Sequence, residues 1–202
     1  EGFSLDAVGD AAAKGGTGVI HKYRGRALLI TTGSCAIHCR YCFRQHFPYA
    51  EETAASSRWS GAIAYLKSDS SITELILSGG DPLSLSTAKL KELTDQVAEI
   101  PHIKRLRIHT RLPVVLPERV DEELLCWIDG LPWPLAIVIH ANHANELGQD
   151  VADALSRLKF RDAVLLNQAV LLKGVNDSIA EQCRLSEQLF DIGVLPYYLH
   201  QL

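Results

Sequence analysis

The sequence has no methionine, no long apolar run and only a small excess of acidic over basic residues. No stretch reaches the roughly eighteen apolar residues that a membrane-spanning helix requires, which argues against an integral membrane protein. No secretory segment, solenoid repeat or low-complexity tract occurs, and this argues against a secreted or a repeat protein. Five cysteines without a signal peptide are typical of a reducing compartment, so we expect a cytoplasmic protein.

Charge and composition limit the partners and the size of the core. The net charge of -4 and the pI of about 6.1 predict neither a nucleic-acid nor a membrane-surface partner, and they leave a homo-oligomer open. With 202 residues, 47% of them hydrophobic, the chain is long enough for one substantial core. Because it starts at Glu1, lacks methionine and ends at Leu202 just after a strand-like run, we expect a piece of a longer protein.

Short apolar runs alternate with longer segments of helical periodicity. We expect strands at 27–32, 74–77, 105–109, 135–140, 164–168 and 194–199, with helices at 60–66, 88–100, 121–128, 146–158 and 177–190. This alternation predicts an α/β fold with parallel strands and outer helices, and six such steps predict an open, partial (β/α)6 barrel of TIM-like type. Residues 1–20 are rich in Gly, Ala and Asp, so we expect an irregular N-terminal extension before a core domain at 21–202.

Three cysteines directly after the first expected strand carry the strongest chemical signal. Cys35, Cys39 and Cys42 have the spacing C-x3-C-x2-C, with the aromatic Tyr41 just before the last. A 4Fe-4S cluster normally takes one cysteine per iron, so three cysteines leave one iron open to a small molecule with amino and carboxylate groups. Such a reduced cluster can cleave S-adenosylmethionine (SAM) and release a 5'-deoxyadenosyl radical. The loop therefore predicts a radical-generating cluster site.

Other interpretations of the cysteines stay open. Structural zinc usually has four ligands, and His38 or His46 lies close enough in sequence to supply the fourth. A disulfide would leave an odd cysteine over, and free cysteines are often small buried hydrophobes. Cys126 and Cys183 lie in helical apolar patterns, so we expect both in the core.

Polar residues also occur where the other expected strands end. They are Gly79, Gly80 and Asp81 after the second strand, Arg111 after the third, His140 and His143 at the fourth, and Gln168 in the fifth. The carboxyl ends of parallel strands meet at one face, so we expect these residues near the cysteine loop. Each has an ordinary alternative: a tight turn with an Asp helix cap, an exposed arginine, a satisfied core histidine, or a structural amide.

Basic residues surround the cysteine loop in an otherwise acidic chain. They are Lys22, Arg24, Arg26, Arg40 and Arg44. Solvated charge is the usual meaning of such a cluster. Next to a cofactor site, however, it favours an anionic ligand such as a phosphate or an amino-acid carboxylate.

Several longer segments resemble the lysine 2,3-aminomutase family of radical SAM enzymes. The resemblance runs from about His21 to the end of the chain. It is carried by HKYRGRALLI at 21–30, CAIHCRYCFRQHFPY at 35–49, SGGDPL at 78–83, RLRIHTRLPVVLP at 105–117, IHANHANEL at 139–147, LLNQAVLLKGVND at 165–177 and LPYYLH at 195–200. The segment CRYCFR followed by HFPY is most similar to the branch that makes (R)-β-lysine for the modification of translation elongation factor P.

The resemblance implies three cofactors. A 4Fe-4S cluster would be held by Cys35, Cys39 and Cys42. SAM would be held by Tyr41, Gly79, Gly80 and Asp81, with Arg111, His140 and Gln168 nearby. Pyridoxal phosphate would place its phosphate at Arg26 and Lys22, and Arg44 would bind the carboxylate of the substrate, L-lysine.

The implied activity is an isomerase that moves the amino group of L-lysine from the α to the β carbon. It would need a reducing electron donor and would have a functional link to elongation factor P and its lysine ligase. In the family, the lysine that binds pyridoxal and a carboxylate for the substrate amine lie beyond the sixth strand. Neither is found in this chain, so we assign no catalytic residue and expect the chain alone to be incomplete. The alternatives are an aminomutase of the fermentative lysine branch or for another amino acid, and a zinc-stabilised binding module without catalysis.

Overall fold

The computed structural model describes residues 6, 9–42, 44–49 and 59–201, and it divides the chain after Arg107 into two units. The first unit contains strands β1 to β4, and the second contains β6 to β8, in chain order within each unit. Strand β5 (Arg105–His109) spans the boundary.

In the described part of the first unit, antiparallel strands lie where an irregular extension was expected. After a short 3-10 helix, η1 (Ala11–Ala13), β1 (Lys14–Gly16) pairs with β2 (Val19–Tyr23), which pairs with β3 (Arg26–Thr32). Gly18 and Gly25 have φ values of +74° and +86° in the two connecting turns. Glycine adopts this conformation without the strain that a side chain brings, and two-residue turns join antiparallel strands. The expectation of irregular structure was therefore wrong for residues 11–20.

The rest of the first unit follows the expected strand–helix order. Helix α2 (Ser60–Ser68) leads to β4 (Glu74–Gly79), which pairs with β3 in parallel. The short helix η3 (Pro82–Ser84) and helix α3 (Thr87–Ala98) follow, and Ser86 caps α3 by accepting a hydrogen bond from the Lys89 amide. The side chains buried in this unit are mainly aliphatic: Leu29, Ile30, Leu66, Leu75, Leu77, Leu90 and Leu93.

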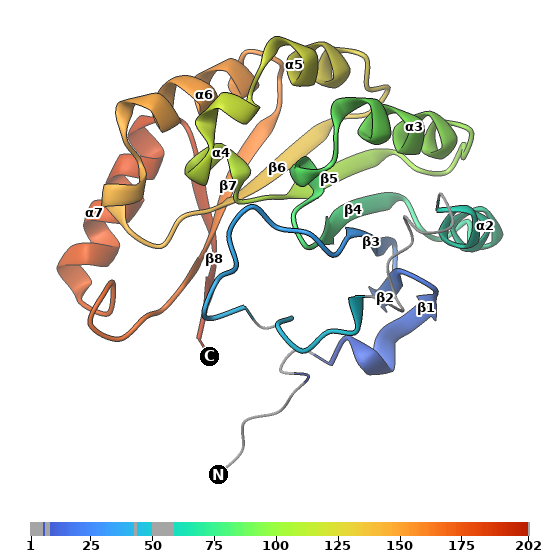
Figure 1. Ribbon diagram of the computed structural model, residues 1–202, viewed down its shortest axis with the longest axis horizontal. Coiled ribbons are helices and arrows are strands. Elements are labelled where there is room, and N and C mark those ends of the chain that lie inside the picture. The colour runs from blue at the N-terminus through green and yellow to red at the C-terminus, as the bar shows by residue number, and fades with distance from the viewer. Residues whose placement is uncertain (1–5, 7–8, 43, 50–58, 202) are drawn as a thin grey trace. The chain divides into compact units, whose positions relative to one another are not determined.

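The second unit repeats the alternation around a parallel sheet. The elements are α4 (Leu112–Val115), η4 (Pro117–Arg119), α5 (Glu122–Asp129), β6 (Leu135–His140), η5 (Ala144–Glu146), α6 (Gln149–Lys159), β7 (Val164–Val170), α7 (Ile179–Asp191) and β8 (Leu195–His200). Strands β6, β7 and β8 pair in parallel, and α6 and α7 lie along one side of them (Figure 1). Asp121 and Ser178 cap α5 and α7 with their side-chain oxygens, which explains where these helices begin.

Strand β8 departs from the buried strand that its apolar sequence predicts. Most of its residues are exposed, including Leu195, Tyr198 and Leu199. The register with β7 shifts by one residue, because Asn167 faces Pro196 whereas Gln168 faces Tyr198. Such a bulge brings consecutive side chains towards the same side, and the rings of Tyr197 and Tyr198 lie 4.2 Å apart between centroids.

Two cysteines also differ from expectation. Cys126 in α5 and Cys183 in α7 were predicted to be core residues, but both are exposed. In α5 the buried positions are Leu124, Leu125, Trp127 and Ile128, so Cys126 lies on the remaining, outer face. Helical periodicity identified the helices correctly and assigned these two positions to the wrong face.

No helix in the described part of the chain is long and apolar enough to cross a membrane.

Candidate functional site

The three motif cysteines lie in a loop that follows β3 directly. Cys35, Cys39 and Cys42 are half-buried, and the Cys42 amide donates to the Cys39 carbonyl at 3.1 Å, which closes one turn around Tyr41. Burial raises the pKa of Cys35 to about 11, and the negative charges of Asp81, Cys42 and Cys39 add to the shift. The three thiols are thus close enough to interact electrostatically, and metal binding must displace their protons.

The spacing of these side chains bears on the choice between zinc and a cluster. Among the residues that the structure describes, no three Cys, His, Asp or Glu side chains form a group that could hold one metal ion. A tetrahedral zinc with Zn–S bonds of about 2.3 Å would hold its sulfurs within about 4 Å of one another. A cluster binds each cysteine to a different iron, so its ligands lie further apart. His38 and His46, the proposed fourth zinc ligands, are both exposed. Three cysteines are the ligand set of a 4Fe-4S cluster with one open iron, whereas structural zinc requires a fourth ligand, so the ligand set favours the cluster.

The glycine turn after β4 packs directly on the start of the cysteine loop. The Gly80 amide donates to the Thr32 carbonyl at 2.7 Å, and the Asp81 amide donates to the Ser34 carbonyl at 2.8 Å. A Cβ on Gly80 would stand 2.2 Å from the Ser34 oxygen, and Gly79 has a φ of +112°. Both glycines are thus required by close backbone approach. Asp81 is buried and caps η3 by accepting from the Leu83 amide, as its structural interpretation predicted.

A buried carboxylate joins two of the predicted anion-binding residues. Asp10 lies 2.7 Å from the Lys22 ammonium and 2.8 Å from Nε of Arg44, and its side chain is only 4% exposed. Arg44 also donates to Oγ of Ser78, at the end of β4, at 3.3 Å. Two cations and one carboxylate leave a single positive charge, which suits an anionic ligand. The sequence interpretation missed Asp10, which lay in the segment expected to be irregular.

Arg26 has a different partner. It begins β3, whereas the cysteine loop follows the other end of that strand, six residues or roughly 20 Å along the backbone. Its Nε lies 3.8 Å from Glu74, and Arg107 donates to the same carboxylate at 2.8 Å. Glu74 is buried, so two arginines neutralise a carboxylate that would otherwise be costly to bury. The structure therefore pairs Arg26 with Glu74 rather than with Asp10.

In the second unit, His140 and Gln168 stand side by side. They face each other in the register of β6 and β7, and paired residues of parallel strands project to the same side of the sheet. Burial lowers the pKa of His140 to about 4, and the positive charges of Arg111 and His200 lower it further. His140 is therefore neutral at pH 7 and can accept or donate a hydrogen bond.

Arg111 is held by an ion pair. Its Nη2 lies 2.7 Å from Glu146, and the other oxygen of Glu146 accepts hydrogen bonds from the amides of Asn142 and His143. The side chain of His143 in turn accepts from the Asn145 amide, so both residues complete the N-terminal cap of η5. The ion pair with Glu146 therefore fixes the orientation of Arg111, whose positive charge acts on His140.

Three buried asparagines hold the strand ends of the second unit together. Asn167 exchanges two hydrogen bonds with the backbone of Ala141. Asn142 accepts from the Val170 amide, and Asn176 donates to the carbonyls of Asn142 and Val170. The side chains of these asparagines thus bond to the backbone and hold the strand ends in place.

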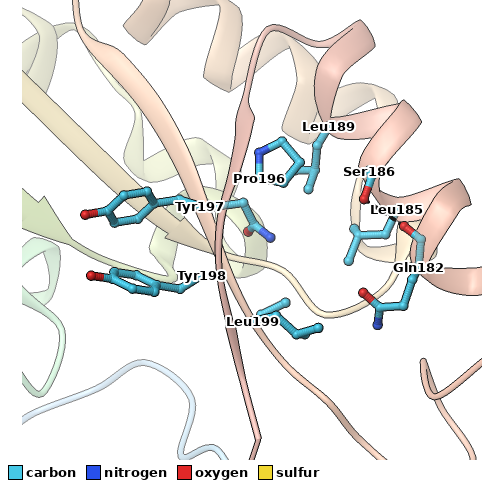
Figure 2. Close-up of a pocket in the computed structure, with 10 residues that line it drawn as sticks. Gln182, Leu185, Ser186, Leu189, Pro196, Tyr197, Tyr198 and Leu199 are labelled. Atoms are coloured by element: carbon cyan, nitrogen blue, oxygen red, sulfur yellow. Dashed lines mark hydrogen bonds between the residues drawn. The ribbon is translucent and has the colours of Figure 1, made fainter.

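A hollow of about 250 Å³ lies between β7, β8 and α7 (Figure 2). Its walls include Gln182, Leu185, Ser186 and Leu189 from α7 and Pro196 and Leu199 from β8. Asn167 and Ala169 also line it, whereas Gln168 does not. Because side chains alternate along a strand, the hollow is on the opposite side of β7 from Gln168 and lies outside the candidate site.

Comparison with known families and structures defines the class of the protein. Residues 16–110, which include the cysteine loop and the glycine turn, match the family model described as "4Fe-4S single cluster domain". A radical SAM methyltransferase from Sphaerobacter thermophilus is structurally similar, with a TM-score of 0.53 and 18% identity over 89% of this chain and 57% of that one. A radical SAM methyltransferase from Kitasatospora setae gives a TM-score of 0.53 and 14% identity over 87% of this chain and 34% of that one. The predicted α/β fold of the radical SAM type is thereby confirmed.

Curated relatives narrow the class further. The chain is 46% identical to the L-lysine 2,3-aminomutase of Haemophilus influenzae over its whole length and 47% identical to that of Escherichia coli over 92% of it. It is 36% identical to that of Clostridium subterminale over 91% of its length. The chain is thus similar to the lysine 2,3-aminomutase family along most or all of its length. It spans 60%, 54% and 44% of the length of these three relatives.

Proposed function

We propose that this chain is the cluster- and SAM-binding part of a lysine 2,3-aminomutase, an isomerase. The observation that carries the proposal is the packing of the glycine turn on the cysteine loop, with Gly80 and Asp81 bonded to the backbone at Thr32 and Ser34. This contact supports the proposal because it joins the proposed SAM-binding turn to the start of the loop that carries the three proposed cluster ligands. The relatives named L-lysine 2,3-aminomutase support the choice of reaction.

The proposed roles of the residues are those that the family resemblance implies. Cys35, Cys39 and Cys42 would bind the cluster, and Tyr41 and the Gly79–Asp81 turn would bind SAM beside it. His140, Gln168 and Arg111 would contribute from the strand ends of the second unit. A cluster and SAM, when bound, supply a 5'-deoxyadenosyl radical. The protein's task is then to hold the substrate in one orientation and to exclude water from the radical.

Anion binding is proposed for Arg44 and Lys22. Arg44 would bind the carboxylate of L-lysine, while Asp10 fixes its Nε from the other side. Lys22 would contact the phosphate of pyridoxal phosphate, which supplies an electron-withdrawing ring when bound. Arg26 was expected to share this phosphate, and its pairing with Glu74 makes it the weaker of the two candidates. No lysine of this chain is assigned as the pyridoxal-binding residue.

The finer assignment is to the branch that makes (R)-β-lysine for elongation factor P. It is supported by the segment CRYCFR followed by HFPY, which resembles that branch. A reducing electron donor and the lysine ligase of elongation factor P would be its functional partners, in the cytoplasm. The fermentative lysine branch, or another amino acid as substrate, is the competing proposal.

The experiment uses the longer protein that carries this chain, purified and reconstituted without oxygen. Iron and sulfide analysis and the visible spectrum first establish the cluster. Incubation with L-lysine, pyridoxal phosphate, SAM and dithionite should then yield β-lysine by chromatography, and a panel of other amino acids should not react. Absence of β-lysine with all three cofactors demonstrably bound would contradict the proposed reaction. A colourless protein with one zinc would contradict the class.

Substitution of Arg44 tests the substrate contact. Arg44→Ala should raise the Kd for lysine by about 30-fold or more, because loss of one member of a buried charge pair costs at least about 2 kcal/mol. Reductive cleavage of SAM should continue at a similar rate. Arg40→Ala, at an exposed position in the same loop, is the matched control. Equal loss of lysine binding and SAM cleavage in Arg44→Ala would show that its role is assigned wrongly.

A further inference from the structure

Tyr49 contacts both the glycine turn and the start of the cysteine loop. Its hydroxyl donates a hydrogen bond to the Gly79 carbonyl at 2.8 Å. A Cβ built on Gly33 would stand only 2.9 Å from Cβ of Tyr49, so the two backbones approach closely. The cysteine loop therefore leaves β3 at Gly33 and returns, fourteen residues after Cys35, to the same place at Tyr49.

The phenol of Tyr49 is well suited to act as a donor. Burial raises its pKa above the ordinary value of a tyrosine, an effect that the nearby Arg44 charge only partly opposes, so the hydroxyl keeps its proton. The ring of Phe47 lies 5.1 Å away between centroids and helps to fix the side chain. Neither the cluster motif nor the glycine motif includes Tyr49, and no role was assigned to it from the sequence.

The Gly79 carbonyl, which accepts this hydrogen bond, is also held in place by its own backbone. Gly79 has a φ of +112°, and the next amide, that of Gly80, is bound to the Thr32 carbonyl. A carbonyl oxygen has two lone pairs, so the Gly79 oxygen can accept from Tyr49 and from a second donor at once. Under the proposed function, that second donor is the amino group of the methionine part of SAM.

We propose that Tyr49 is a positioning residue for SAM: its hydroxyl sets the direction of the Gly79 carbonyl and so determines SAM affinity. This inference rests on the proposed function. It differs from a purely structural role because the hydroxyl acts on the SAM contact, whereas the ring alone maintains the packing on Gly33 and Phe47. Removal of the hydroxyl should therefore change SAM binding and leave cluster assembly unchanged.

Tyr49→Phe removes the hydroxyl and keeps the ring. In anaerobically reconstituted protein, iron and sulfide content should equal those of the wild type. The Kd for SAM, measured from the change in the EPR spectrum of the reduced cluster as SAM is added, should rise about threefold to tenfold, the range of one lost hydrogen bond. The rate of SAM cleavage at saturating SAM should stay within about twofold. Tyr23→Phe, at a position that is 66% exposed in the same unit, is the matched control and should change nothing.

Gly33→Ala provides a second variant, because its methyl group would push Tyr49 away from the glycine turn. It should raise the Kd for SAM in the same direction as Tyr49→Phe. An unchanged Kd in Tyr49→Phe would overturn the inference, and so would a loss of cluster that parallels the loss of SAM binding, which would show a structural role. A wild-type protein that assembles no cluster would instead refute the proposed function, so the two failures are distinguishable.

Discussion

The cysteine loop of the first unit and the strand ends of the second unit differ in the interactions that hold them in place. The three cysteine side chains are half-buried, and exposed residues such as Ile37 and Arg40 stand between them. In the second unit, by contrast, the strand ends are tied by Asn142 and Asn176, which are buried and bonded to the backbone. The second region is therefore held by the protein's own hydrogen bonds, whereas the proposed cluster would add bonds that hold the first.

The largest effect is expected from removal of one cluster ligand. Cys39→Ala should abolish the cluster, and with it all SAM cleavage, because three thiolates are the minimum for this site. The Tm of the metal-free protein should hardly change, since the lost side chain is only half-buried. Iron analysis and thermal unfolding measure the two quantities. Cys126→Ala, at an exposed position, is the control, and a similar loss of iron in that variant would break the comparison.

The opposite pattern is expected for the asparagines. Asn176→Ala removes three hydrogen bonds, to the Leu172 amide and to the carbonyls of Asn142 and Val170, and leaves these groups buried without their partner. The free energy of unfolding should fall by roughly 3–4 kcal/mol. Urea denaturation measures it, with the exposed Asn145→Ala as control. Iron uptake at low temperature should be retained, and its loss would show that the two regions are not independent.

Acid should weaken the second region selectively. His140 has a pKa of about 4 in the folded protein, whereas an unfolded histidine titrates near 6.5, so only the unfolded chain binds the proton between these values. Stability should therefore fall by about 2–3 kcal/mol as the pH drops from about 6.5 to about 4. His140→Gln should flatten this dependence, and His46→Gln, at an exposed position, should not. An equally steep loss in His140→Gln would assign the acid sensitivity to other groups.

The smallest effect is expected from an exposed ion pair outside both regions. Lys91 and Asp95 lie 2.7 Å apart on α3, and both side chains are more than 60% exposed. Lys91→Ala should lower the free energy of unfolding by about 0.3–0.5 kcal/mol, and salt should reduce the difference further. Urea denaturation at low and high salt tests this. A loss of more than about 1 kcal/mol would show that solvent exposure does not make a polar contact weak.

Most of the regular elements and the local motifs could be predicted from the sequence. Strands such as 105–109 and 135–140 were predicted with their actual bounds, because apolar runs between polar turns have few alternatives. The initial hairpins were missed, although Gly25 marks a turn, because the short strand at 14–16 contains two glycines and no apolar residue. The exposure of β8 was missed because strand pattern alone does not tell whether a neighbour covers it.

Contacts between distant segments could not be predicted. Asp10 lies twelve residues before Lys22 and thirty-four before Arg44, and nothing in its local sequence marks it as their partner. Tyr49 and Gly79 are likewise thirty residues apart. Most candidate site residues could be proposed from the sequence because they stand at a strand end or in a spaced motif, which sequence shows directly. What holds them in place depends on the packed structure.

The contact between Gly80 and Ser34 has one more consequence. With no room for even a methyl group between them, the two segments cannot slide or separate by small amounts without breaking two backbone hydrogen bonds. A ligand that shifts the glycine turn would therefore also shift the backbone at Ser34, the residue before Cys35. The glycine turn and the peptide before Cys35 would then move as one unit.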